Sequence, residues 1–207
     1  VVKDAASVDV RFAFCFPDLY EVGMSHLGMK ILYSLMGGGD DIWCERVFAP
    51  GDDFERVMRE HQIPLFGLES LDAIADFDMI GFTLQYELSF TAILNMLDLA
   101  GLKVRSKDRP GLAPLVVAGG PCACNPEPIA DFIDLFILGE GEQVNLELID
   151  LYKACKRGGA SKEAFLRRAA QIEGIYVPSL YDVTYRPDGT VDAVTPRGDA
   201  PAVVHKR

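Results

Sequence analysis

Small and polar residues gather in four short segments, and each segment follows a run of apolar residues. Glycine in such a segment permits a positive φ and lets a ligand lie directly against the backbone. Acidic, hydroxyl and amide side chains beside these glycines can hold a polar ligand through hydrogen bonds. Their composition favours binding of a ligand over catalysis. The four segments are Pro17-Asp-Leu-Tyr-Glu-Val-Gly-Met-Ser-His-Leu-Gly28, Thr83-Leu-Gln-Tyr86, Gly119-Gly-Pro121 and Gly139-Glu-Gly-Glu142.

The ligand is not expected to be held by its phosphates. The Walker pattern Gly-x-x-x-x-Gly-Lys-Ser/Thr is absent, and so is Gly-x-Gly-x-x-Gly after the first apolar run. Glu140 and Glu142 would also repel a phosphate group. These two acids favour recognition of hydroxyl, ribose or amide groups.

Groups that could perform acid–base or nucleophilic chemistry are few. His26 could act as a ligand or an acid–base group, or it could hold the start of a helix. His61 is expected to end a surface helix, and His205 lies in the C-terminal tail. No arrangement of Ser, Cys and His indicates a nucleophile, so no catalytic residue is predicted.

Two other chemistries are disfavoured. Asp18 resembles a response-regulator phosphoacceptor only superficially, because the acidic pair upstream and the Lys after the fifth strand are both missing. The closest pair among five cysteines is Cys122-x-Cys124, which has no second pair or nearby His to complete a metal site. We therefore expect no metal ligands and reduced thiols, as in a reducing cytoplasm.

Apolar runs alternate with helical patterns along most of the chain, which is typical of a parallel sheet covered on both faces. We therefore predict an α/β, doubly wound, mainly parallel five-stranded sheet of the flavodoxin-like or Rossmann-like kind. The carboxyl ends of its strands would bring the four polar segments to one edge. The expected strands are residues 8–16, 42–48, 79–84, 115–118 and 135–138, and the expected helices are residues 25–36, 52–61, 90–100, 144–155 and 161–171.

The composition changes near residue 175, where β-branched and aromatic residues begin. Tyr185-Arg-Pro-Asp-Gly189 reads as a turn between two strands, so a C-terminal β-hairpin extension is predicted. The expected organisation is an α/β domain over residues 8–172, the hairpin extension over residues 173–195 and a linker over residues 196–207.

The charge balance bears on partners. Twenty Lys and Arg against 31 Asp and Glu give a net charge of −11, and the acids are scattered along the chain. Such a surface repels phosphate backbones and anionic lipid, so neither nucleic acid nor membrane is expected as a partner. No apolar stretch approaches the ~20 residues of a membrane helix, and no signal peptide is evident, which favours a cytoplasmic protein.

The motifs as a set resemble the N-terminal, cobalamin-binding-type domain of radical SAM proteins. The resemblance covers residues 8–194, and the order of the motifs is specific. They are Phe16-Pro-Asp-Leu-Tyr-Glu-Val-Gly-Met-Ser-His-Leu-Gly28, Ile80-Gly-Phe-Thr-Leu-Gln-Tyr-Glu-Leu-Ser89, Val117-Ala-Gly-Gly-Pro-Cys-Ala123 with Asn125-Pro-Glu127, and Gly139-Glu-Gly-Glu142.

The resemblance implies a cobalamin-binding module that is not catalytic as an isolated fragment. In such proteins a radical SAM barrel follows this domain, and its Cys-x-x-x-Cys-x-x-Cys motif holds a four-iron cluster. That motif is absent from these five cysteines. S-adenosylmethionine and the 4Fe-4S cluster are therefore expected only in a radical SAM domain of the same full-length protein, which would be this domain's partner.

The resemblance also implies a cofactor site. The pattern Asp-x-His-x-x-Gly, which supplies a cobalt ligand in cobalamin proteins, corresponds here to Asp18-x-Tyr20-x-x-Gly23, and His26 lies three residues beyond it. The loop after the first strand and Tyr86 would face the corrin, while the glycine loops and Thr83 would line the nucleotide tail. The predicted cofactor-binding residues are Asp18, Tyr20, Gly23, His26, Thr83, Gln85, Tyr86, Gly119, Gly120, Pro121, Gly139, Glu140, Gly141 and Glu142.

Two alternatives stay open. A degenerate Rossmann-like domain without cofactor would act as a docking or protein-interaction module, and it would show a filled crevice and an exposed apolar face. Tyr20, Phe82, Gln85 and Tyr86 are bulky enough to support that interpretation. A flavin or small-nucleotide binder on the same fold is the other alternative, because a fold alone does not assign a ligand.

Overall fold

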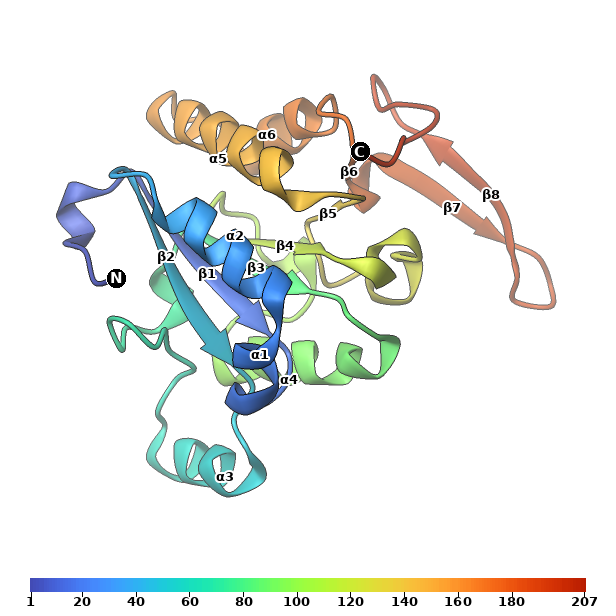
Figure 1. Ribbon diagram of the computed structural model, residues 1–207. Helices are drawn as coiled ribbons and strands as arrows, with labels where there is room; N and C mark the ends of the chain where they lie inside the picture. The colour runs from blue at the N-terminus through green and yellow to red at the C-terminus, as the bar shows by residue number, and fades with distance from the viewer.

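A six-stranded sheet forms the centre of the molecule in the computed structural model, which describes residues 1–207 (Figure 1). The strand order is β2-β1-β3-β4-β5-β6. All neighbours pair in parallel except β5 and β6. The strands are β1 (Val10–Phe16), β2 (Ile42–Phe48), β3 (Met79–Thr83), β4 (Leu115–Gly119), β5 (Leu135–Ile137) and β6 (Ile175–Tyr176). The doubly wound α/β prediction is confirmed, with one strand more than the five expected.

The sixth strand corrects the predicted hairpin boundary. Ile175 and Tyr176, which were assigned to the hairpin extension, instead pair antiparallel with Ile137 and Phe136. Both residues are buried, and Gly174 reverses the chain just before them with φ +88°. Because they are buried against the edge of β5, Ile175 and Tyr176 belong to the central sheet and not to the hairpin.

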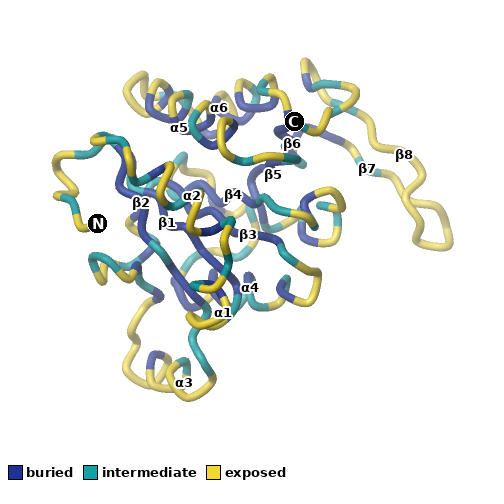
Figure 2. The backbone as a smooth tube through the Cα atoms, viewed as in Figure 1, coloured by how far each residue is buried: buried dark blue, intermediate teal, exposed yellow.

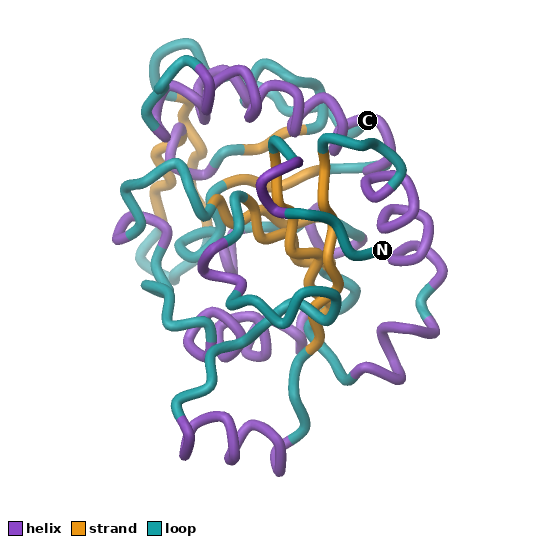
Figure 3. Tube along the Cα trace, turned by 90° about the vertical axis from the view of Figure 1, so that its left-hand side faces the viewer, coloured by secondary structure: helices purple, strands orange, loops and turns teal.

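Helices cover both faces of the sheet (Figures 1 and 3). The chain steps from β1 to β2 in one direction and from β3 to β4 in the other, so right-handed crossovers place the intervening helices on opposite faces. Figure 1 shows α2 and α5 on one side of the sheet and α4 on the other. The helices are α1 (Tyr20–Ser25), α2 (Leu27–Gly37), α3 (Asp52–His61), α4 (Phe90–Leu99), α5 (Gly141–Arg157) and α6 (Lys162–Ala169).

Short 3-10 turns fill most of the connections between strands and helices. The turns are η1 (Ala5–Ser7), η2 (Ile74–Asp76), η3 (Glu87–Ser89), η4 (Ser106–Asp108), η5 (Pro121–Cys124), η6 (Glu127–Ile129) and η7 (Pro178–Leu180). Of these, η3 and η5 follow the carboxyl ends of β3 and β4, where the polar segments lie.

One apolar core of 50 buried residues runs along both faces of the sheet (Figure 2). Every residue of β3 is buried, as expected for a central strand covered on both faces. The strand order reverses between the paired strands β1 and β3, which is the topological switch point of the fold. The loops after these two strands lead to helices on opposite faces of the sheet, α2 and α4.

A buried charge cluster joins the amino ends of β4 and β5 to α6. Asp134 accepts hydrogen bonds from the Val116 backbone at 2.8 Å and from the Ser106 hydroxyl. Its carboxylate also contacts Lys162 at 2.7 Å and Arg109 at 3.4 Å. Two cations thus share one carboxylate, and desolvation lowers the pKa of both Lys162 and Arg109.

The outer edge of β2 is covered by side chains and by a loop. Lys3 Nζ donates to the Ile42 carbonyl at 2.6 Å. Glu69 accepts from the Arg46 amide at 2.8 Å, and the Leu68 amide donates to the Arg46 carbonyl at 2.9 Å. Three backbone groups of this edge strand, at Ile42 and Arg46, are therefore paired.

A two-stranded hairpin of β7 (Tyr181–Tyr185) and β8 (Val191–Pro196) projects from the sheet (Figure 1). The residues after β8 return to the sheet. The Arg207 amide donates to the Leu138 carbonyl at 3.1 Å, and the Glu140 amide donates to the Arg207 carbonyl at 3.0 Å. The segment predicted as a linker thus contacts the loop that follows β5.

Candidate functional site

A pocket of about 190 Å³ opens at the carboxyl edge of the sheet, between the sheet and helices α2 and α5. All four polar segments contribute to its wall. Three of them follow the parallel strands β3, β4 and β5, which all end there. The loop after β1 contributes His26 and Gly28, at the far end of that loop. The sequence expectation that these segments meet at one edge therefore agrees with the structure.

Glycines leave the backbone bare around this pocket. Gly81, Gly119, Gly120, Gly139 and Gly141 all line it. Gly120 has φ +110°, and a Cβ there would lie 2.9 Å from the Leu84 carbonyl oxygen, so the position requires glycine. A flat group could therefore lie directly against the ends of β3 and β4.

A chain of hydrogen bonds crosses the mouth of the pocket. His26 Nδ1 accepts from the Met29 amide at 3.2 Å and so caps the N-terminus of α2. Nε2 must then carry the proton, which it donates to Gln85 Oε1 at 3.1 Å. The Gln85 amide in turn donates to the Thr83 hydroxyl. Both nitrogens of His26 are thus engaged within the protein.

The loops on either side of the switch point touch each other. The Tyr86 hydroxyl donates to Asp18 at 3.2 Å, and this carboxylate raises the pKa of Tyr86. The Tyr20 ring packs edge-on against Phe48, with 5.3 Å between the ring centroids. Asp18 and Tyr86 are therefore in contact across the switch point, whereas Tyr20 lies against β2 and lines a different cavity. None of the three lines the carboxyl-edge pocket.

The other predicted residues take different places. Gly23 is buried beside Phe48, with which a Cβ would collide, so it has a packing role. Pro121 is an exposed residue that begins η5. Glu140 and Glu142 are exposed at the N-terminus of α5, and Arg207 covers the backbone beside Gly139. None of these four residues lines the pocket.

Several lining residues were missed from the sequence. Leu32 and Met36 reach the pocket from α2, and the buried Asn145 reaches it from α5, where it donates to the Gly141 carbonyl at 2.7 Å. Asn145 lies one helical turn after Gly141 and next to the buried Val144. A polar residue on the apolar face of a helix is a sequence signal that could have identified Asn145 as a pocket residue.

Three further observations concern metal ligands, thiol reactivity and membrane helices. No three His, Cys, Asp or Glu side chains come close enough together to hold a metal ion. Burial and the adjacent Glu87 raise the pKa of Cys122, so this thiol is a poor nucleophile. No helix is both long and apolar enough to cross a membrane.

Comparison with known proteins finds a relative in sequence, a neighbour in structure and a matching family. An uncharacterized protein of Methanocaldococcus jannaschii is 32% identical over 142 residues, which are 67% of this chain and 26% of that protein. A radical S-adenosylmethionine methyltransferase, TsrM, from Kitasatospora setae, solved with tryptophan and a SAM analog, aligns at a TM-score of 0.47 and 16% identity, covering 90% of this chain and 30% of that one. The chain thus spans about a quarter of its curated relative's length.

Residues 28–178 match the family described as radical SAM proteins, N-terminal. The matched segment runs from the start of α2 to the turn after β6 and includes the glycine loops of the pocket. This chain belongs to the family of N-terminal regions of radical SAM proteins.

Proposed function

We propose that this domain binds cobalamin at the carboxyl edge of its sheet for use by a radical SAM domain of the same protein. The observation that carries the proposal is the glycine-lined pocket at the topological switch point. Ligands of open α/β sheets bind at such crevices. S-adenosylmethionine and a 4Fe-4S cluster would belong to the radical SAM domain.

The pocket suits the nucleotide tail of cobalamin rather than the corrin. Its volume of about 190 Å³ is a little above the ~150 Å³ of a cavity that binds benzene, so one fused ring system can enter. Thr83, Gln85 and Asn145 offer hydroxyl and amide groups to the ribose and amide parts of the tail. The corrin would then face Asp18 and Tyr86, which are in contact with each other.

His26 would not ligate cobalt, because both its nitrogens are already hydrogen-bonded. The role of this chain is therefore to bind and orient the cofactor and to shield one side from water. When bound, cobalamin supplies a cobalt centre able to carry an alkyl group or an electron. The reaction of the whole protein is methyl transfer or a rearrangement in this proposal.

Titration with hydroxocobalamin, followed by visible absorption, tests the proposal. Leu32→Phe should fill the pocket from α2 and raise the dissociation constant about tenfold, since overpacking costs about 1–3 kcal/mol. Leu35→Phe is the matched control, because Leu35 lies on the same helix but is exposed and does not line the pocket. If the unsubstituted protein gives neither a spectral change nor a thermal shift, the cobalamin proposal is wrong.

A second candidate is a docking module without cofactor. Leu19, Tyr20 and Val22 are exposed on and beside α1, and Leu88 in η3 is 84% exposed. Exposed apolar side chains at one edge favour contact with another domain. Hydrogen exchange compared between full-length protein and this chain would reveal protection of residues 19–22 and 88. Equal exchange would exclude docking at this edge.

A further inference from the structure

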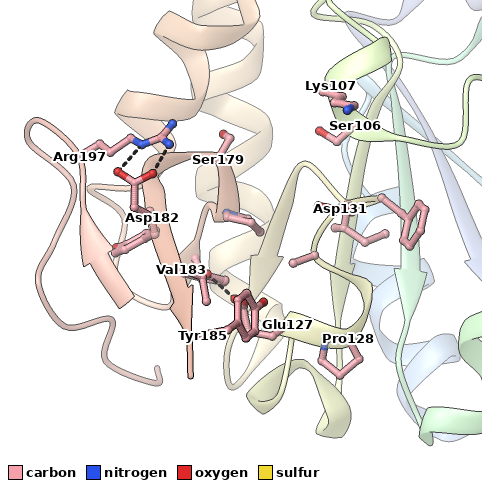
Figure 4. A pocket seen from close by; sticks show the side chains of 16 residues that line it. Ser106, Lys107, Glu127, Pro128, Asp131, Ser179, Asp182, Val183, Tyr185 and Arg197 are labelled. Carbon is pink, nitrogen blue, oxygen red and sulfur yellow. Dashed lines mark hydrogen bonds and ion pairs between the residues drawn. The ribbon is translucent and has the colours of Figure 1, made fainter. Parts of the chain in front are cut away.

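A second cavity, of about 560 Å³, lies between the β7–β8 hairpin and the segments that precede and follow β4 (Figure 4). It shares no lining residue with the carboxyl-edge pocket. The sequence did not predict it, because its two sides are more than 40 residues apart in the chain and meet only where the hairpin packs beside η6.

Three tyrosines form an aromatic wall of this cleft. Tyr176 and Tyr181 are each only 8% exposed, and their rings lie 5.1 Å apart at 42°. The Tyr181 hydroxyl donates to the Pro201 carbonyl at 2.7 Å, so its hydrogen bond is satisfied within the protein. Tyr185, which is 60% exposed, extends the wall along β7 (Figure 4).

One carboxylate beside this wall has no cationic partner. Glu127 accepts a hydrogen bond from the Tyr176 hydroxyl at 2.6 Å and makes no ion pair, and it lines the cleft together with Tyr185. The other acids of the cleft are neutralised, because Asp131 pairs with Arg105 at 2.8 Å and Asp182 pairs with Arg197. Glu127, at the tyrosine end of the cleft, is therefore the carboxylate whose negative charge has no cationic partner.

This combination attracts a positive group. The faces of neutral aromatic rings attract cations, and a carboxylate beside them adds a direct ionic contact. Burial and Glu127 raise the pKa of Tyr176, which keeps its hydroxyl protonated and its ring neutral. Lys107 lies at the opposite end of the cleft from Glu127, so a cation would avoid that end (Figure 4).

We propose that the cleft binds an organic cation, a guanidinium or ammonium group, against Tyr176, Tyr181 and Tyr185 and beside Glu127. The group could belong to a small metabolite or to an Arg or Lys side chain of a polypeptide. The chemistry of recognition is the same in both cases.

Binding of Nα-acetyl-L-argininamide, followed through the NMR resonances of the tyrosine rings, tests this proposal. Nα-acetyl-L-citrullinamide is the uncharged control ligand, because it keeps the shape and has neither a guanidinium nor a free amino group. Glu127→Gln should raise the dissociation constant about tenfold, as loss of a charge-assisted contact does. Tyr185→Ala should weaken binding severalfold, whereas Tyr185→Phe should retain it. Glu60→Gln makes the same charge change on exposed α3 and should leave the affinity unchanged.

Each outcome is decisive. Shifts confined to the three tyrosines, with an affinity reduced about tenfold in Glu127→Gln, support the site. An Arg-containing peptide that binds more tightly than argininamide identifies a polypeptide as the source. No shift at tens of millimolar argininamide would overturn the proposal. So would equal binding of citrullinamide, or an unchanged affinity in Glu127→Gln with the chain still folded.

Discussion

His26 shows how the neighbours of a residue decide its chemistry. Its position in a glycine-containing loop after β1 suggested a ligand or an acid–base group. In the structure one nitrogen caps α2 and the other donates to Gln85, so the imidazole has no free position. The histidine thus holds the start of a helix next to the pocket.

His26→Ala should therefore act on stability rather than on a cobalt centre. Losing the cap should lower the free energy of unfolding by about 1 kcal/mol. The visible absorption bands of bound cobalamin should keep their positions, because no ligand to cobalt is removed. Chemical denaturation and a cobalamin titration measure the two effects. A shift of the bands in His26→Ala, absent in Gln85→Ala, would show that His26 binds cobalt.

At the scale of elements, the Asp134 cluster ties η4, β4, β5 and α6 together. Asp134→Asn would leave Lys162 and Arg109 buried without a counter-charge. We expect it to lower the free energy of unfolding by about 3–5 kcal/mol. Lys162→Met leaves Arg109 paired with Asp134, so it should lower the free energy of unfolding by less than Asp134→Asn does. Urea denaturation of both variants checks this order, and a larger loss in Lys162→Met would contradict it.

The strands were the most predictable elements. The expected strand 42–48 and the expected helix 52–61 coincide with β2 and α3, because a run rich in apolar residues and an acidic first turn are strong local signals. The expected helix 25–36 corresponds to α2 (Leu27–Gly37), and the short helix α1 (Tyr20–Ser25), which ends just before His26, was not predicted. β6 was missed because its two residues are defined only by pairing with β5.

Part of the candidate site could be predicted from the sequence and part could not. The glycine loops were predictable because parallel strands bring their carboxyl ends to one edge. Leu32 and Asn145 were not predicted, because they reach the pocket only when α2 and α5 pack against the sheet, and local sequence does not specify that packing. The cleft beside the hairpin depends on how β7 packs against η6, which no local pattern specifies.

For the whole molecule, alkaline pH should be destabilising. Burial raises the pKa of Cys15, Cys44, Tyr152 and Tyr176, and burial with Glu69 raises the pKa of Tyr33 to about 12. Above pH 9 to 10, the unfolded chain loses protons that the folded chain keeps, so the stability of the fold falls as pH rises. Urea midpoints measured from pH 8 to pH 11 should decrease, and a constant midpoint would contradict this prediction.

The paired edge of β2 has a consequence for behaviour in solution. An uncovered edge strand offers its amides and carbonyls to another molecule and so starts sheet-to-sheet aggregation. Here Lys3, Glu69 and the Leu68 amide occupy the Ile42 carbonyl and the Arg46 amide and carbonyl, and the short β6 pairs with β5 on the other side of the sheet. Fewer backbone groups are thus open to a foreign strand, which lowers the tendency of the central sheet to aggregate.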